Sequence, residues 1–352
     1  MTDARIPLTI LTGFLGSGKT SLLKRFLSDA QSGRTAIIVN EYGETQIDGD
    51  LITFAGDTTA VRTTTGCLCC TMSGDVKDAL IELGEAQKVA TIALFEHLII
   101  ETTGLADPSS LVHAVLSDPA IQQLYRFNRV ITTIDALRGE YALERYDEAR
   151  QQIHLADTIV VTKTDLIEDP ISERELDGFI TTLTQTNPAA NVVRTDAVTP
   201  THLFKLGDTQ HTHQHAHAHD HDHHHDHGHD HGHDHDHGHK HDHHDHSHSH
   251  THSVASFTLR FNDQLSEHHL KHTLTALGEQ HGAALLRVKG FVKTTTPTGP
   301  KILLVQGVGG LFQFTETDIE TGTSQLVFIT NALSETDAAA AFTSAHADHV
   351  PQ

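Results

Sequence analysis

The sequence GFLGSGKT occupies residues 13–20 and directly follows the apolar run PLTILT at residues 7–12. It matches the pattern G-x-x-x-x-G-K-[ST], in which glycines allow a tight loop whose backbone N–H groups point at phosphate oxygens. Apolar side chains at helical spacing after the loop predict a helix over 19–30. A strand before the loop and a helix after it are the context that indicates phosphate binding, because the helix adds its positive N-terminus.

Each residue type in this loop has an expected contact with a bound nucleotide. Lys19 supplies a cation for the β- and γ-phosphates, which makes it a predicted catalytic residue. The Thr20 hydroxyl is the predicted protein ligand of Mg²⁺. The remaining expected nucleotide contacts in this stretch are Gly13, Gly16, Ser17, Gly18 and Ser21.

A second segment, Thr162-Lys163-Thr164-Asp165, follows the apolar run at 158–162 and resembles the guanine-reading N-K-x-D motif. Asp165 is expected to accept hydrogen bonds from the guanine ring N–H and exocyclic amine, which adenine does not offer. The stem of Lys163 is expected to pack along the base. Thr162 stands where Asn is usual. Together with the phosphate loop, this segment predicts GTP as the nucleotide.

A third segment, Glu101-Thr102-Thr103-Gly104, ends the predicted strand at 97–101. A carboxylate there can hold Mg²⁺ through water, so Glu101 is the second predicted catalytic residue. The N–H of Gly104 is expected to bond the γ-phosphate. The residue that orients the attacking water is not assigned from the sequence.

Further short apolar runs predict strands at 35–40 and 129–135, and helical patterns separate the strands near 74–88, 140–154 and 170–185. Strands that alternate with helices favour a parallel sheet covered on both faces. The predicted fold class is therefore α/β, with the parallel sheet of a P-loop NTPase and a smaller α+β C-terminal domain.

The three cysteines, Cys67, Cys69 and Cys70, are the only ones in the chain and lie within four residues. Three thiolates at this spacing can surround one soft or borderline cation, and zinc prefers four ligands. A fourth position would stay open for transfer of the metal. Glu41 and Glu44 are candidate oxygen ligands nearby. Buried cysteines or a purely structural zinc site remain as alternatives.

Residues 211–252 hold 23 of the chain's 33 histidines, together with eight aspartates. The stretch has no aliphatic side chain larger than alanine, so it is expected to be disordered without metal. It indicates a multi-site metal reservoir or capture arm, with a solvated spacer as the alternative. The formal net charge of −22 argues against nucleic acid and anionic membranes as partners.

After the His-rich stretch, strand patterns return near 257–261, 285–289, 301–305 and 325–329, with a helix over 264–280. On that predicted surface helix we expect His268, His269 and His272 to be solvated. The predicted domains are a GTPase domain (1–205), a disordered metal-binding linker (206–252), a C-terminal α+β domain (253–335) and a tail (336–352). With no signal-peptide pattern and no membrane-length apolar run, a cytoplasmic location is expected.

The segments GFLGSGKT, NEYGE, GCLCC, ETTGLADP and TKTD resemble, in this order, those of the CobW-like family of metal-handling P-loop GTPases, and LLRVKGF and KILLVQGVGGLF resemble its C-terminal domain. The resemblance implies Mg²⁺-dependent GTP hydrolysis coupled to metal transfer. It implies that zinc held by Cys67, Cys69 and Cys70 passes to a client metalloprotein. Whether the protein forms a homodimer is left open by the sequence.

Three alternatives remain at the level of the sequence. One is cobalt delivery, since metal availability can override the thiolates' affinity for zinc. Another is a metal buffer in which the His-rich stretch stores zinc and GTP only regulates it. The third is a small-molecule kinase that uses the same phosphate loop, which the TKTD segment argues against.

Overall fold

A computed structural model describes residues 4–28, 34–40, 61–64, 74–89, 92, 95–167, 169–204, 254–297, 299–318 and 322–344. All of them belong to one compact unit, Met1–Asp208 with Ser253–Gln352. The other unit, Thr209–His252, contains the His-rich stretch and lies outside the described residues.

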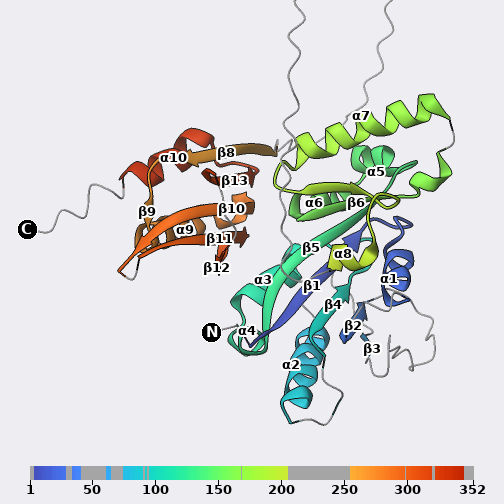
Figure 1. Cartoon of the computed structure of the whole chain (residues 1–352), viewed down its shortest axis with the longest axis horizontal. Helices are drawn as coiled ribbons and strands as arrows, with labels where there is room; N and C mark the ends of the chain where they lie inside the picture. Colours follow the sequence, from blue (N-terminus) through green and yellow to red (C-terminus); the bar gives the residue numbers. More distant parts are fainter. Residues whose placement is uncertain are drawn as a thin grey trace, which may run out of the picture. The chain divides into compact units, whose positions relative to one another are not determined.

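The N-terminal part is built on a parallel sheet with the strand order β3-β2-β4-β1-β5-β6-β7 (Figure 1). All its neighbouring strands pair in parallel, as predicted. Parallel strands end at the same edge, which we call the carboxyl edge; they begin at the opposite edge, the amino edge. The strands are β1 (Ile6–Gly13), β2 (Thr35–Asn40), β3 (Val61–Thr64), β4 (His97–Glu101), β5 (Tyr125–Asp135), β6 (Thr158–Thr162) and β7 (Asn191–Arg194).

Helices cover both faces of this sheet, as the alternating pattern predicted. On β1, Leu8 and Ile10 belong to an apolar core with α2, α3 and α4, whereas Leu11 belongs to a core with α1 and α8. Ile159 and Val161 of β6 pack with α6 and α7. The helices are α1 (Lys19–Leu27), α2 (Gly74–Lys88), α3 (Ser109–Ser117), α4 (Pro119–Leu124), α5 (Gly139–Arg145), α6 (Asp147–Leu155), η1 (Thr164–Leu166), α7 (Pro170–Thr186) and α8 (Pro200–Phe204).

The helices differ from the sequence-based expectation in two respects. The single helix predicted over 140–154 is two helices, because Tyr146 has extended backbone angles, φ −125° and ψ 122°, between α5 and α6. Helices α3 and α4 were not predicted. The start of α4 does carry a local signal, since Asp118 accepts hydrogen bonds from the N–H groups of Ala120 and Ile121 ahead of Pro119.

The C-terminal part is a second sheet with the order β12-β11-β10-β13-β8, antiparallel throughout, with the short β9 added in parallel to β10. Its buried face packs against α9 and α10. This confirms the α+β prediction. The elements are β8 (Ala255–Phe261), β9 (Leu265–Ser266), α9 (Glu267–His281), η2 (Gly282–Ala284), β10 (Leu285–Thr296), β11 (Gly299–Val308), β12 (Leu311–Thr317), β13 (Ser324–Thr330) and α10 (Glu335–Ser344).

The helix over 264–280 begins three residues later than predicted, and one of its histidines is not solvated. His269 is buried, and its Nε2 lies 3.1 Å from the backbone oxygen of Phe342 in α10. Tertiary packing of α10 onto α9 therefore overrides the expectation for His269. Strand β12 was also missing from the prediction.

The two sheets share part of a core. Val308, at the end of β11, is buried among the apolar residues that lie between the parallel sheet and α2, α3 and α4, and Leu311 packs against the same cluster. This shared core explains why the two sheets form one compact unit.

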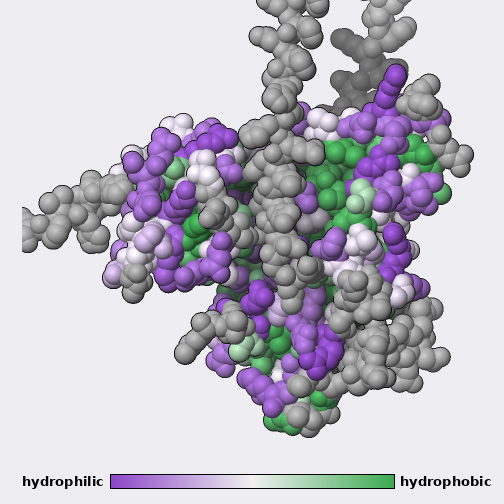
Figure 2. All heavy atoms as spheres, in the orientation of Figure 1, coloured by the Kyte–Doolittle hydropathy of each residue, from purple (hydrophilic) through white to green (hydrophobic). Residues whose placement is uncertain are grey.

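Most of the coloured surface in Figure 2 is hydrophilic, with hydrophobic patches between. Among the described residues, no helix is both long enough and apolar enough to cross a membrane.

Candidate functional site

The loop that joins β1 to α1 has the backbone shape that its glycines predicted. Gly16 and Gly18 have φ values of 72° and 92°, in the left-handed region that favours glycine. A Cβ on Gly13 would lie 2.3 Å from Oγ1 of Thr133 and 2.7 Å from Oγ of Ser17. These last two hydroxyls lie 2.7 Å apart, so the loop rests directly on the end of β5.

Lys19 lies inside this loop and is only 9% exposed. Its Nζ donates to the backbone oxygen of Gly13 at 2.8 Å and to that of Phe14 at 3.4 Å. The loop therefore encloses a cation, held by carbonyl groups of the same loop. Ser21, in contrast, is exposed on the first turn of α1.

The Thr20 hydroxyl and Glu101 meet at the carboxyl edge. Thr20 Oγ1 donates to Glu101 Oε1 at 2.6 Å, and Glu101 is buried at the end of β4. The next residue, Thr102, is tied to β1 by its N–H, which donates to the oxygen of Leu11 at 2.9 Å. A hydroxyl beside a carboxylate is a set of oxygen donors that suits a hard cation, so the residues present fit Mg²⁺.

Gly104 lies against the phosphate loop. A Cβ at Gly104 would come within 2.8 Å of the backbone N and Cα of Leu15, so only glycine allows this approach. The backbone oxygens of Gly104 and Ala106 accept hydrogen bonds from Nε2 of Gln152, at 3.2 and 3.0 Å. Sequence reasoning missed Gln152, because a glutamine within a helical pattern carries no signal of this contact.

The TKTD segment also lies at the carboxyl edge, beside the loop. Thr162 Oγ1 donates to the backbone oxygen of Ser17 at 2.7 Å, so this threonine supports the loop although Asn is usual at its position. Lys163 has a positive φ of 60°, and its Nζ lies 2.5 Å from Oδ2 of Asp135. Asp165 is exposed in η1, open to a ligand. The sequence could have indicated Asp135, because it ends a predicted strand.

Large exposed apolar side chains also gather at this edge. Of the seven among the described residues, six lie after the carboxyl ends of β1, β4, β5 or β6; they are Leu15, Leu105, Leu137, Tyr141, Tyr146 and Leu166. The ring of Tyr146 lies 4.6 Å, centroid to centroid, from that of Phe14. The edge that carries the phosphate loop is thus open and partly apolar.

The predicted metal ligands Cys67, Cys69, Cys70, Glu41 and Glu44 lie outside the described residues. Within the part of the chain that is described, no group of three His, Cys, Asp or Glu side chains is arranged to hold a metal ion.

The loop around Lys19, the Thr20–Glu101 pair and the TKTD segment define the class of a P-loop nucleotide-binding protein. Residues 7–194 match the family described as CobW/HypB/UreG, nucleotide-binding domain, and the chain belongs to this family. Residues 254–346 match the Cobalamin synthesis protein cobW C-terminal domain.

Similar curated proteins include the zinc chaperone YjiA of Escherichia coli, 39% identical over 163 residues, which are 46% of this chain and 50% of that protein. The zinc-regulated GTPase metalloprotein activator 1 of Schizosaccharomyces pombe is 32% identical over 196 residues, 54% of this chain and 46% of its own length. The chain spans about half the length of the curated relatives it matches.

The fold extends further than these matches. The crystal structure of Zn(II)-bound YjiA GTPase from E. coli has a TM-score of 0.61 to this chain at 24% identity, with 97% of this chain and 99% of that one covered. This likeness concerns the fold, including both sheets.

Proposed function

We propose that this protein hydrolyses GTP with Mg²⁺ and uses that reaction to deliver zinc to a client metalloprotein. The observation that carries the proposal is the arrangement at the carboxyl edge: a buried Lys19 inside the glycine loop, with Thr20 and Glu101 paired beside it. The names of the relatives, zinc chaperone and zinc-regulated GTPase metalloprotein activator, support the choice of cargo.

The chain's own residues would divide the chemistry as follows. Lys19 exchanges its bonds to Gly13 and Phe14 for oxygens of the β- and γ-phosphates and stabilises charge that develops there. Thr20 and Glu101 hold Mg²⁺, which neutralises phosphate charge when bound. Gly104 offers its N–H to the γ-phosphate from its position against Leu15.

Guanine selection would come from the segment after β6. Asp165 accepts from the ring N–H and exocyclic amine of guanine, and the stem of Lys163 packs along the base. The Lys163–Asp135 ion pair holds that lysine at the carboxyl edge. Thr162 links the base-reading segment to the phosphate loop through Ser17.

Zinc is the cargo in this proposal, held by Cys67, Cys69 and Cys70, with Glu41 and Glu44 as nearby oxygen donors. The sequence stretches that carry these residues continue from Asn40, the end of β2, and from Thr64, the end of β3. These two strand ends are register partners at the carboxyl edge. The stretches therefore attach to the sheet at the edge where the nucleotide would bind, which supports coupling between nucleotide state and metal release.

The assignment of Asp165 as the guanine-recognising residue is tested by changing which base it can bind. Xanthine carries a C2 carbonyl in place of guanine's amine, so Asp165→Asn should weaken GTP binding by about a hundredfold and strengthen XTP binding. Asp169→Asn, on an exposed carboxylate just beyond the segment, is the matched control and should change neither. Unchanged GTP affinity in Asp165→Asn would overturn the guanine assignment.

The cargo part is tested by competition with a chromophoric zinc chelator, with GDP and with a non-hydrolysable GTP analogue. We expect one tight zinc site per chain that is lost in Cys69→Ser and whose affinity differs between the two nucleotides. Tighter cobalt than zinc binding at that site would favour cobalt delivery. If deletion of 211–252 abolished all tight zinc binding and Cys69→Ser left zinc binding unchanged, the result would favour a metal buffer.

A further inference from the structure

Helix α6 contacts the ETTG segment through one buried side chain. Gln152 is 1% exposed, and its Nε2 bonds both the Gly104 oxygen and the Ala106 oxygen. Its own backbone oxygen accepts from Thr132 Oγ1 of β5 at 2.9 Å. Gly104, which would sense the γ-phosphate, and Ala106 just after it are therefore tied to α6 by two hydrogen bonds from a single amide.

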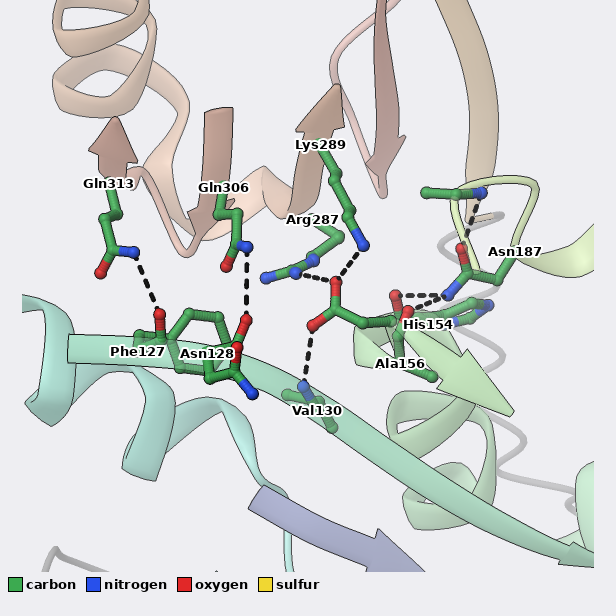
Figure 3. Close-up of polar contacts among 12 residues, drawn as sticks. Phe127, Asn128, Val130, His154, Ala156, Asn187, Arg287, Lys289, Gln306 and Gln313 are labelled. Atoms are coloured by element: carbon green, nitrogen blue, oxygen red, sulfur yellow. Dashed lines mark hydrogen bonds and ion pairs between the residues drawn. The ribbon is translucent and has the colours of Figure 1, made fainter. Parts of the chain in front are cut away.

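The C-terminal end of α6, just after Gln152, is bonded to the residue that follows α7. Asn187 is fully buried, and its Nδ2 donates to the backbone oxygens of Ile153, His154 and Ala156 at 2.7, 3.2 and 3.0 Å. Figure 3 shows the bonds to His154 and Ala156. The next residue is Asp157, five positions after Gln152. A shift of α6 would therefore carry Asp157 with it.

Asp157 is one of the points where the C-terminal sheet is anchored to the parallel sheet, and it carries the buried ion pairs between them. Its Oδ1 is bonded by Nη2 of Arg287 and lies 2.8 Å from Nζ of Lys289, and its Oδ2 accepts from the N–H of Val130 at 2.8 Å. Figure 3 shows Arg287 and Lys289 reaching from the C-terminal sheet toward β5. The Arg287 guanidinium also lies 5.7 Å from the centroid of the Phe127 ring.

This anchor holds two positive charges against one negative charge, all buried. Burial acts to raise the pKa of Asp157, but Arg287 and Lys289 outweigh it and hold that pKa well below its usual range. Burial lowers the pKa of Lys289 against the attraction of Asp157. Buried charges are costly to desolvate, and this cost offsets much of the attraction within the anchor. Stability alone therefore does not explain the arrangement.

Several buried polar atoms along this route have no hydrogen-bond partner within the described part of the chain. They are Oε1 of Gln152, Nδ1 of His154, and Nε and Nη1 of Arg287. A buried polar group is costly while it has no partner, so an arrangement that supplies one is stabilised relative to this one. They lie at the contact with the ETTG segment, at the end of α6, and at the anchor.

We propose that Gln152 is the positioning residue for Gly104–Ala106, and that α6 couples this segment to the Arg287–Asp157–Lys289 anchor of the C-terminal sheet. The C-terminal sheet thereby influences the rate of hydrolysis through Gln152. The inference rests on the proposed GTPase function. It adds a role for the C-terminal sheet that does not require that sheet to touch nucleotide or metal.

The test is a double-mutant cycle on the full chain with Gln152→Met and Arg287→Met. Gln152→Met keeps the length of the side chain and removes the amide, whereas Arg287→Met leaves the Lys289–Asp157 pair intact. The matched control is Gln313→Leu, which removes a hydrogen bond from β12 to the Phe127 oxygen, away from α6. Gln152→Asn, a shortened amide, serves as the second variant if Gln152→Met does not fold.

We expect Gln152→Met to lower kcat for GTP about tenfold, because Gly104–Ala106 would no longer be held in position. GDP affinity should stay within about twofold, because GDP binding does not need this segment. Arg287→Met should change kcat about threefold in the wild-type background and leave it unchanged in the Gln152→Met background. Gln313→Leu should leave kcat unchanged. Wild-type kcat in Gln152→Met, or equal effects of Arg287→Met in both backgrounds, would overturn the coupling.

Hydrogen exchange separates this inference from the proposed function. Exchange of the Ala106 amide, which donates to the Thr103 oxygen at 3.2 Å, is measured without any hydrolysis. We expect it to accelerate at least about threefold in both Gln152→Met and Arg287→Met and not in Gln313→Leu. If the wild type hydrolysed no GTP, the proposed function would fail, and this exchange pattern would still decide the coupling; unchanged exchange in both variants would overturn it.

Discussion

The two edges of the parallel sheet use polar groups in opposite ways. At the carboxyl edge, Lys19 donates to backbone oxygens of its own loop, and Asp165 is exposed. At the amino edge, Asp157 is saturated by Arg287, Lys289 and the Val130 N–H. The same strands, β5 and β6, carry both arrangements. One edge keeps its charges available for a ligand, and the other uses them to fasten a second sheet.

Strand β4 shows the same contrast within five residues. His97 at its amino end is buried, with Nε2 2.8 Å from Oγ1 of Thr9. Glu101 at its carboxyl end pairs with Thr20 of the phosphate-loop helix. If the comparison is correct, substitutions at the amino edge should change stability and substitutions at the carboxyl edge should change activity.

The largest effect is expected at the anchor. Asp157→Leu should lower the free energy of unfolding by about 3–5 kcal/mol, because Arg287 and Lys289 would stay buried without a counter-charge. Urea unfolding measures this. Adding Arg287→Met and Lys289→Met to the same chain should recover most of the loss. A loss below about 1 kcal/mol for Asp157→Leu would mean that the amino edge does not depend on charge compensation.

At the carboxyl edge, Lys19→Met should lower kcat for GTP by about a hundredfold or more, since the cation acts on charge that develops at the phosphates. The free energy of unfolding should change by about 1 kcal/mol at most, because the bonds of Lys19 to Gly13 and Phe14 lie within one short loop. Lys24→Met, on the same helix, is the control and should change neither quantity. A large loss of stability in Lys19→Met would contradict the proposal that substitutions at the carboxyl edge change activity and not stability.

A third effect concerns pH. Burial, aided by Arg129 and Arg126, lowers the pKa of His97 to about 3. The unfolded chain binds a proton there below about pH 6.5, and the folded protein does not until about pH 3, so stability falls as pH drops through this window. His97 should contribute a loss of about 1.6 kcal/mol between pH 6.5 and 5, with a slope that approaches about 1.4 kcal/mol per pH unit at the lower end.

Urea unfolding of the wild type and of His97→Gln at several pH values checks this, and the variant should have the shallower slope. His113→Gln, at an exposed position of α3, is the matched control for the loss of an imidazole. Equal slopes for the wild type and His97→Gln would show that His97 is not the group responsible.

The smallest effect is expected at Thr162. Thr162→Val removes the bonds of Oγ1 to the oxygens of Ser17 and Ile134, so KM for GTP should rise about threefold to tenfold, in line with about 1 kcal/mol for a hydrogen bond. Thr195→Val removes a similar bond, to the Val161 oxygen, away from the loop. It should leave KM unchanged. Equal effects of both variants would mean that Thr162 supports β6 in general and not the phosphate loop.

Much of the carboxyl edge was predictable, because its residues follow one another along the chain in short motifs. Gly13 to Thr20, Glu101 to Gly104 and Thr162 to Asp165 each end a strand whose apolar run is visible in the sequence. Since the carboxyl ends of parallel strands meet at one edge, the assembly of these segments follows from the fold class. The α/β class and the second α+β sheet were predicted on the same basis. The domain boundaries and the roles of Cys67, Cys69 and Cys70 stay predictions.

The amino edge was not predictable. Asp157 and Arg287 are 130 positions apart, and neither stands in a motif, so no local pattern indicates that they meet. Gln152 looks like an ordinary polar residue of a helix, and the break at Tyr146 between α5 and α6 has no glycine or proline to mark it. Local motifs and apolar periodicity are properties of neighbouring residues, and they determined the nucleotide loop and the alternation of its flanking strands with helices. The pairing of the buried charges and the choice of the helix that holds the ETTG segment depend on how distant elements pack. Only the tertiary structure decided these two features.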